Sequence, residues 1–160
     1  MVIGQAPGAQ TEAKRYHFAG PGGRLLETWF EAAGFPAGTW RERSYITSLT
    51  RCFPGKAVRS KGDRKPSPAE LALCRPFLDA ELALVRPRLI LLVGTMAIET
   101  FLGKRSLDEV VGTLCEQDGR LLLPLPHPSP VSRWLNNPAH RELVDRAIAL
   151  LARCRVELDL

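Results

Sequence analysis

The sequence predicts an α/β fold, a three-layer α/β/α sandwich with a central, mainly parallel sheet of four strands. Two observations carry this prediction. Strand-like and helix-like segments alternate along the chain, and residues 88–93 form a continuous apolar run, which is typical of a parallel strand covered on both faces. The chain has 160 residues, a size typical of a single domain, and we assign residues 1–160 to one domain.

Local patterns predict the elements of the first half of the chain. Residues 1–4 form the end of a buried strand, residues 22–33 form a helix with one apolar face, and residues 45–49 form a strand rich in β-branched and aromatic side chains. Residues 67–70 (Ser-Pro-Ala-Glu) combine a capping serine, a proline at the first helical position and a glutamate three residues after the cap. They start a helix that runs to about residue 86, with a kink expected near Pro76.

The second half of the chain continues the alternation. After the apolar strand 88–93, residues 94–102 form a short helix. The Asp-Gly pair at 118–119 predicts a hairpin turn between strands 111–116 and 120–125. A final helix begins at Pro138 behind the capping residue Asn137.

Positive charge is concentrated in one segment. The chain has 22 Lys and Arg against 17 Asp and Glu, a net charge of +5. Residues 51–65, here called the basic loop, contain six basic residues and one acid, Asp63, so the rest of the chain sums to zero. A solvated insertion would look the same, but a loop of this charge beside a site is also what a phosphate-binding surface requires, and its contribution would fall steeply with salt.

Composition excludes several classes of protein. The longest apolar run, residues 89–93, is too short to span a membrane, and the first residues lack the pattern of a signal peptide. The four cysteines contain no CxxC pair, which favours reduced thiols. We therefore expect a cytoplasmic monomer that does not bind membranes.

Candidate site residues follow the expected parallel strands, because ligands of such sheets bind beyond the carboxyl ends of the strands. These ends are residues 4–8, 48–50 and 127–129. Glycines around Pro7 give the first segment a rigid turn whose amides can face a ligand. His127 lies between two prolines, so its backbone is fixed and its ring can point into a cleft.

The order and spacing of these segments carry a resemblance. Residues 4–8 (GQAPG), 17–26 (HFAGPGGRLL), 45–47 (YIT), 51–54 (RCFP) and 127–132 (HPSPVS) look like the motifs of the uracil-DNA glycosylase superfamily, in the same order. The match is closest to its iron–sulfur branch (family 4/5-like). The resemblance implies a monofunctional DNA-repair glycosylase that hydrolyses the N-glycosidic bond of uracil, or of a related deaminated base, in single- or double-stranded DNA. The base would be flipped out of the strand and would leave as an anion.

The resemblance also implies roles for individual residues. His127 would donate a hydrogen bond to the departing base, and Phe18 would stack on it. The catalytic candidates are His127, Gln5 and Ala6. The candidates for base binding are Gly4, Pro7, Gly8, Phe18 and Ser48. The candidates for DNA binding are Ser129, Val131 (the apolar wedge position), Ser132, Arg133, Arg51, Lys56, Arg59 and Lys61.

Three positions depart from the motifs of the superfamily. Ser48 stands where many members have Asn, Gln5 where the iron–sulfur branch commonly has Glu, and Ala6 where the best-studied branch has a catalytic Asp. Ser48 opens the choice of base beyond uracil. Because neither Gln5 nor Ala6 supplies a carboxylate, a second hypothesis for the function stays open, namely a catalytically weak superfamily member that binds DNA or a nucleobase.

The iron–sulfur branch holds a 4Fe-4S cluster with four cysteines. Cys52 and Cys74 match the last two of these ligands, whereas the first two have no counterpart in this sequence. Cys115 and Cys154 fall elsewhere and are expected to be ordinary thiols. Two thiolates cannot hold such a cluster alone, so we expect one only if an upstream CxxC segment is missing. The strand that begins at Met1 favours such a missing segment.

Overall fold

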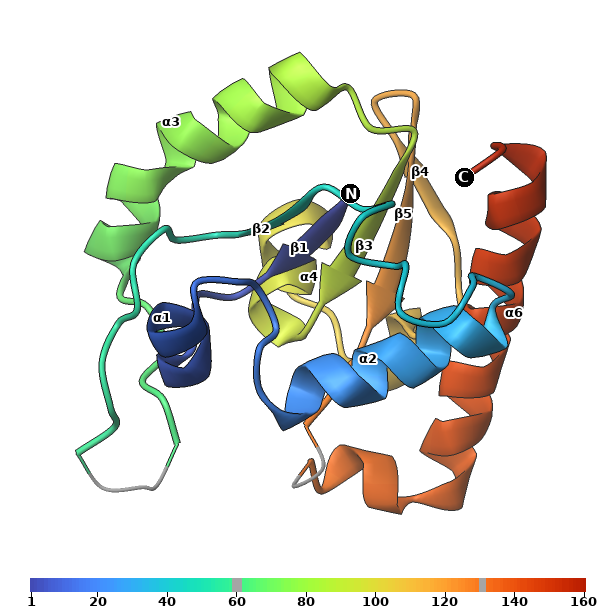
Figure 1. The fold of residues 1–160 in the computed structure, drawn as a ribbon, viewed down its shortest axis with the longest axis horizontal. Helices are drawn as coiled ribbons and strands as arrows, with labels where there is room; N and C mark the ends of the chain where they lie inside the picture. The colour runs from blue at the N-terminus through green and yellow to red at the C-terminus, as the bar shows by residue number, and fades with distance from the viewer. Residues whose placement is uncertain (59–61, 130–131) are drawn as a thin grey trace.

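A β-sheet forms the middle of the molecule (Figure 1). The structure is a computed structural model that describes residues 1–58, 62–129 and 132–160. Its elements, in chain order, are β1 (Val2–Gly4), α1 (Ala9–Lys14), α2 (Pro21–Ala32), β2 (Ile46–Ser48), α3 (Pro68–Val85), β3 (Leu89–Val93), α4 (Thr95–Leu102), α5 (Leu107–Val110), β4 (Cys115–Gln117), β5 (Arg120–Leu125), the 3-10 helix η1 (Trp134–Asn136) and α6 (Pro138–Glu157).

The strand order places the candidate segments side by side. In the described part of the chain the order is β2-β1-β3-β5-β4, with β2, β1, β3 and β5 parallel and β4 antiparallel to β5. The predicted mainly parallel sheet is confirmed, and β4 extends it from four strands to five. The chain leaves β1 toward β2 on one side and later returns to β3 on the other, so the carboxyl ends of β1 and β3 lie at a topological switch point, where such sheets bind ligands.

Helices cover both faces of the sheet, which confirms the three-layer prediction (Figure 1). Successive residues of a strand point to opposite faces. Val2 therefore packs with α2 and α6 in one core, whereas Ile3 packs with α3 and α4 in the other. All five residues of β3 are buried, as expected for a strand between two helical layers.

The predicted helix starts are confirmed. Ser67 accepts from the amide of Glu70 and the Glu70 side chain accepts from the amide of Ser67, so the capping box of α3 is complete, and Pro76 lies inside that helix. Asn137 caps α6 through the amide of Ala139. Among the described ranges, no helix combines the length and the apolar character that a membrane crossing needs.

The sequence did not predict α1 or α5, and the predicted hairpin strand 111–116 is shorter. Ser106 and Glu109 form a second capping box, which draws residues 107–110 into a helical turn and leaves only Cys115–Gln117 to pair with β5. The predicted turn is confirmed, since Asp118 and Gly119 both have positive φ, of 51° and 70°, as a two-residue hairpin requires.

Candidate active site

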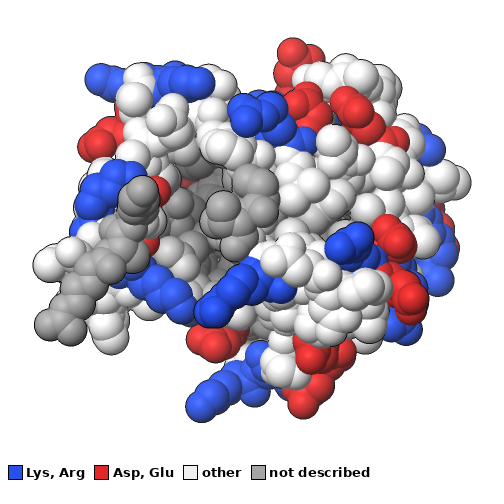
Figure 2. All heavy atoms as spheres, turned by 90° about the horizontal axis from the view of Figure 1, so that it is seen from below, with Lys and Arg blue, Asp and Glu red and all other residues white. Residues whose placement is uncertain are grey.

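A cavity of about 530 Å³ opens at the carboxyl ends of the parallel strands. Its walls come from the segment after β1, the turn before α2, the ends of β2, β3 and β5, and part of the basic loop. Figure 2 shows the face onto which these elements converge, hollowed and bordered by Lys and Arg side chains. The size is typical of a small-molecule site. The predicted segments 4–8 and 127–129 therefore meet at one place.

Phe18 forms part of the cavity wall and is held there by an unusual backbone. Its φ of 54° lies in the left-handed region, which costs a non-glycine residue on the order of 1–3 kcal/mol. The Arg41 guanidinium donates to the Phe18 carbonyl oxygen at 3.2 Å, and the Phe18 ring meets Trp40 edge-on at 6.1 Å between centroids. A Cβ on Gly4 would lie 3.3 Å from Phe18 Cζ, so the ring lies directly against Gly4. The surroundings thus fix an aromatic ring at the end of β1.

His127 reaches the same cavity from the end of β5. Its backbone carbonyl accepts from the Ser129 amide at 2.8 Å, and Gly94, at the end of β3, leaves room for the ring. Solvent reaches the side chain through the cavity, while the surrounding walls lower its pKa below the ordinary 6.5 by desolvation. The imidazole is therefore neutral at neutral pH, with one N–H donor and one acceptor nitrogen.

The side chains of Ser48 and Arg51 already form hydrogen bonds or ion pairs within the protein. The Ser48 hydroxyl donates to the carbonyl of Thr50 at 2.7 Å, so toward the cavity its oxygen can only accept. Arg51 donates to Thr47 Oγ1 at 2.7 Å and pairs with Glu81 at 2.8 Å. A phosphate contact by Arg51, as expected from the sequence, would have to displace these partners.

The basic loop folds back over the segment after β1. Lys56 and Asp63 face each other in an antiparallel bridge, and Lys56 Nζ lies 2.6 Å from Asp63 Oδ1. Asp63 Oδ2 accepts from the amide of Ala9 at 3.3 Å, and a Cβ on Gly8 would lie 3.0 Å from the same oxygen. The loop therefore adds Lys56 and Asp63 to the cavity wall.

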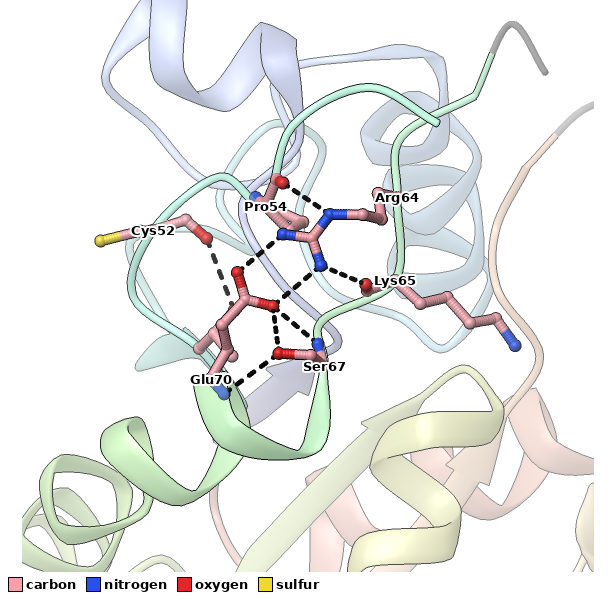
Figure 3. A network of polar contacts seen from close by, with 7 residues as sticks. Cys52, Pro54, Arg64, Lys65, Ser67 and Glu70 are labelled. Atoms are coloured by element: carbon pink, nitrogen blue, oxygen red, sulfur yellow. Dashed lines mark hydrogen bonds and ion pairs between the residues drawn. The ribbon is translucent and has the colours of Figure 1, made fainter. Parts of the chain in front are cut away.

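A network of polar contacts anchors the basic loop to α3 (Figure 3). Arg64 donates to both carboxylate oxygens of Glu70, at 2.9 and 2.7 Å, and to the carbonyl of Pro54 at 2.9 Å. The contacts from Arg64, followed by those from Ser67, lower the pKa of Glu70 to about 2. Bidentate contacts of this kind hold an arginine side chain more firmly than a single hydrogen bond does.

Replacing Glu70 by Gln is expected to loosen the basic loop, because a neutral amide cannot pair with both nitrogens of Arg64. We expect hydrogen exchange at the amides of Ala57 and Arg64, which bond within the loop, to become about threefold faster or more. The ionised Glu70 carboxylate stabilises the loop fully above its ordinary pKa of 4.5, and this stabilisation is lost as the pH falls toward about 2. The difference in exchange rate between the variant and the wild type should therefore disappear in acid. Asp79→Asn, which breaks the exposed pair with Arg75 on the same helix, is the control and should leave these amides unchanged.

The remaining predicted DNA-binding residues divide into two groups. Ser129 lines the cavity, Ser132 is half-buried and Arg133 is exposed at the start of η1. The amides of Ser129 and Ser132 donate within their own loop, so any phosphate contact from these two residues would come from their hydroxyl groups. Val131, Arg59 and Lys61 lie outside the described residues.

Comparison with known families agrees with this geometry. The model of the uracil DNA glycosylase superfamily matches residues 1–151. The chain belongs to the uracil DNA glycosylase superfamily. The segments that form the cavity after β1, β2 and β5 are the same ones that carry the motif resemblance, so the predicted superfamily is confirmed.

Curated relatives place the chain within the superfamily. It is 29% identical over 148 residues to a Type-4 uracil-DNA glycosylase of Thermotoga maritima, covering 91% of this chain and 72% of that protein. It is 31% identical over 99 residues to a Type-4 uracil-DNA glycosylase of Archaeoglobus fulgidus, covering 62% of this chain and only 45% of that protein. It is also 23% identical over 152 residues to a DNA polymerase of Bacillus phage SP01, of which it covers 15%. The Type-4 relatives confirm the branch that the motifs predict.

The cysteines of this sequence do not by themselves fit the four-iron cluster that the resemblance implies. Cys74 Sγ lies 3.5 Å from the amide of Arg51, so Cys52 and Cys74 come from neighbouring parts of the basic loop and α3. Figure 3 shows the Cys52 side chain directed away from the Arg64–Glu70 network. Within the described ranges no group of three or more metal-ligating side chains occurs. A cluster at Cys52 and Cys74 would need two further thiolates, and no step of the chemistry below is derived through it.

The cavity residues to which the sequence assigned no role include His17 and Asp63. His17 directly precedes Phe18, and its pKa is lowered chiefly by burial and further by Arg51, against an opposing effect of Glu81. Its place beside Phe18 in the motif could have indicated it. Asp63 lies in a loop, and nothing in the local sequence shows that it returns to residue 9.

Proposed function

We propose that this chain is a DNA-repair glycosylase that hydrolyses the N-glycosidic bond of uracil, or of a related deaminated base, in DNA. One observation carries the proposal: Phe18, His127 and the segment from Gly4 to Gly8 line a single cavity, although they come from three separate parts of the sequence. The cavity combines an aromatic surface for a flipped base with a donor for a base that leaves as an anion. Residues 1–160 act as one domain in this proposal.

His127 and Phe18 divide the work on the base. A neutral imidazole N–H can bond the carbonyl oxygen on which the negative charge of the leaving base develops, and a positioned donor of this kind contributes on the order of 3–4 kcal/mol to the transition state. Phe18, held by Gly4 and Trp40, offers a rigid ring for stacking. Backbone groups at Gln5 and Ala6, with Pro7 and Gly8, border the reacting sugar.

Ser48 favours a base with a ring N–H. Because its hydroxyl proton is directed to Thr50, its oxygen presents lone pairs to the cavity. Uracil, hypoxanthine and xanthine carry a ring N–H that can donate a hydrogen bond to this oxygen. The corresponding ring nitrogen of cytosine is itself an acceptor and cannot donate one. A hydroxyl makes one contact where an amide makes two, so the choice among deaminated bases is broader than an amide would allow.

DNA is the partner in this proposal, and positive side chains around the cavity contact its phosphates. Lys56 lies on the cavity wall and Arg133 is exposed beside the His127 segment. Figure 2 shows Lys and Arg side chains beside the hollow on one face of the molecule. The affinity is therefore expected to fall with salt.

The test is excision from labelled oligonucleotides that carry one uracil, hypoxanthine, xanthine or cytosine, single-stranded and paired, followed by alkaline cleavage of abasic sites. We expect cleavage at uracil and none at cytosine. If every strand stays intact at a large excess of enzyme, the glycosylase proposal is wrong.

A second function is favoured by Ser48 and by the absence of a carboxylate at Gln5 and Ala6, namely a superfamily member that binds DNA or a nucleobase without cleaving it. The same oligonucleotides distinguish the two. Tighter binding to uracil-containing DNA than to normal DNA, without cleavage, would support the binding function.

A further inference from the structure

We infer that Asp63, supplied by the basic loop, is the carboxylate that positions and deprotonates the attacking water. The inference rests on the proposed glycosylase function and names a catalytic group for it. It accounts for how a site can hydrolyse a glycosidic bond when its first motif carries Gln5 and Ala6 instead of an acid.

The cavity wall holds one carboxylate among the residues that the structure describes, and it is that of Asp63. Asp63 lies across from the segment that the base and sugar would border: its Oδ2 accepts from the Ala9 amide at 3.3 Å and sits 3.0 Å from the position of a Cβ on Gly8. A side chain distant in sequence thus brings a negative charge to the end of the first motif.

The contacts of Asp63 leave it able to hold a water molecule. A carboxylate has about four lone-pair positions. Lys56 Nζ takes one on Oδ1 at 2.6 Å and the Ala9 amide takes one on Oδ2. The side chain is 34% exposed, so a further hydrogen-bond partner can approach it from the cavity.

Hydrolysis releases a proton from the attacking water, and a carboxylate on the cavity wall can accept it. Water attacks C1′ of the flipped nucleotide, the bond between C1′ and the base nitrogen breaks, and its electron pair leaves with the base, whose anion accepts from His127. One proton of the water passes to the Asp63 carboxylate and returns through solvent to the base anion. The sum is nucleotide plus water giving an abasic sugar and free base, and a negative carboxylate also stabilises the positive charge that develops on the sugar.

The four other ionisable groups on the described cavity wall do not fill this role. Lys56 and Arg64 are cations bound to Asp63 and Glu70, and His127 is placed at the departing base. His17 also lines the cavity, but it lies close enough to Arg51 and Glu81 for both charges to act on its pKa, so we place it toward the β2 and α3 side of the cavity, away from Gly8 and Ala9. Asp63 is the acceptor that remains.

The alternative is that Asp63 only ties the basic loop to α1. Asp63→Asn keeps the contact with α1, because its amide oxygen can still accept from the Ala9 amide, and it removes both the carboxylate that could take a proton from water and the ion pair with Lys56. We expect the single-turnover rate of uracil excision to fall about 100-fold in Asp63→Asn, and the affinity for abasic product DNA to stay within about threefold of wild type. Glu12→Gln, which changes an exposed carboxylate on the neighbouring α1, is the matched control and should keep the wild-type rate.

A second variant, Asp63→Ala, allows a measurement that would not change if Asp63 only held the basic loop against α1. In Asp63→Ala the missing carboxylate can be replaced by added formate, which we expect to raise the excision rate in a saturable way and to leave the wild-type rate unchanged. An active wild type with Asp63→Asn within threefold of it would overturn the role of Asp63 alone. The same conclusion follows if both Asp63 variants lose rate and product affinity together and formate restores nothing. A wild type without activity would overturn the proposed function itself.

Discussion

His127→Ala is expected to lower the single-turnover rate of uracil excision by about 100- to 1000-fold, the loss seen when one donor to a developing anion is removed. The imidazole N–H acts on the base only as its bond to the sugar breaks. The affinity for uncleaved DNA should therefore change little, and the loss should appear in the rate and not in binding. Rapid-quench kinetics with enzyme in excess measure the rate, and titration of DNA containing an uncleavable uracil analogue measures the affinity.

His127→Gln is the informative control, because the Gln amide keeps a neutral donor on a side chain of similar reach. It should recover part of the lost rate, whereas the alanine variant should not. Equal rates for His127→Ala and the wild type would remove His127 from the mechanism, and a loss of DNA affinity as large as the loss of rate would assign it to binding.

The lowered pKa of His127 also predicts how stability depends on pH. Desolvation penalises the charged ring in the folded protein, so the unfolded chain, with an ordinary value near 6.5, takes up a proton more readily. Stability therefore falls as pH drops below 6.5, and His17 contributes with the same sign. In His127→Ala the decrease in Tm between about pH 7.5 and about pH 5.5 should be smaller than in the wild type.

Much of the fold and part of the site could be predicted from local sequence. The apolar run of β3 and the capping box of Ser67 and Glu70 involve residues within a few positions of one another, and both predictions are confirmed. His127 lies between two prolines, and Phe18 belongs to the segment 17–26 that resembles a superfamily motif, so both could be named as candidates from the sequence, and both line the cavity.

Contacts between distant residues explain what could not be predicted. Arg51 lies in a basic segment, which favours DNA binding, but its guanidinium is paired with Glu81, thirty residues away on a helix whose position depends on the whole sheet. Asp63 reaches Ala9 across 54 positions. Charge counts along the chain cannot show which charges are taken up by partners elsewhere in the fold.

Gly23→Ala is expected to destabilise the protein by about 3 kcal/mol or more and to disturb the base-binding cavity. A Cβ on Gly23 would lie 1.7 Å from the carbonyl oxygen of Phe18 and 2.9 Å from Arg41 Nη2. The first contact is with backbone, which no rotation of a side chain can relieve. The turn that holds Phe18 in its left-handed conformation, or the first turn of α2, would have to move.

The glycine at this position thus makes the Phe18 geometry possible. The Arg41 guanidinium donates to the Phe18 carbonyl in the space that a side chain at residue 23 would fill, so the same change removes the contact that fixes the ring. Urea unfolding measures the free energy of unfolding, and the rate of uracil excision reports whether the base-binding cavity is intact. The control is Gly20→Ala, at the N-cap of α2, where the nearest atom lies 3.7 Å from the new Cβ, and we expect a cost below about 1 kcal/mol there. If Gly23→Ala proves as stable and as active as Gly20→Ala, the close packing of Phe18 against α2 does not hold the cavity in shape, and the ring must be positioned by Gly4 and Trp40 alone.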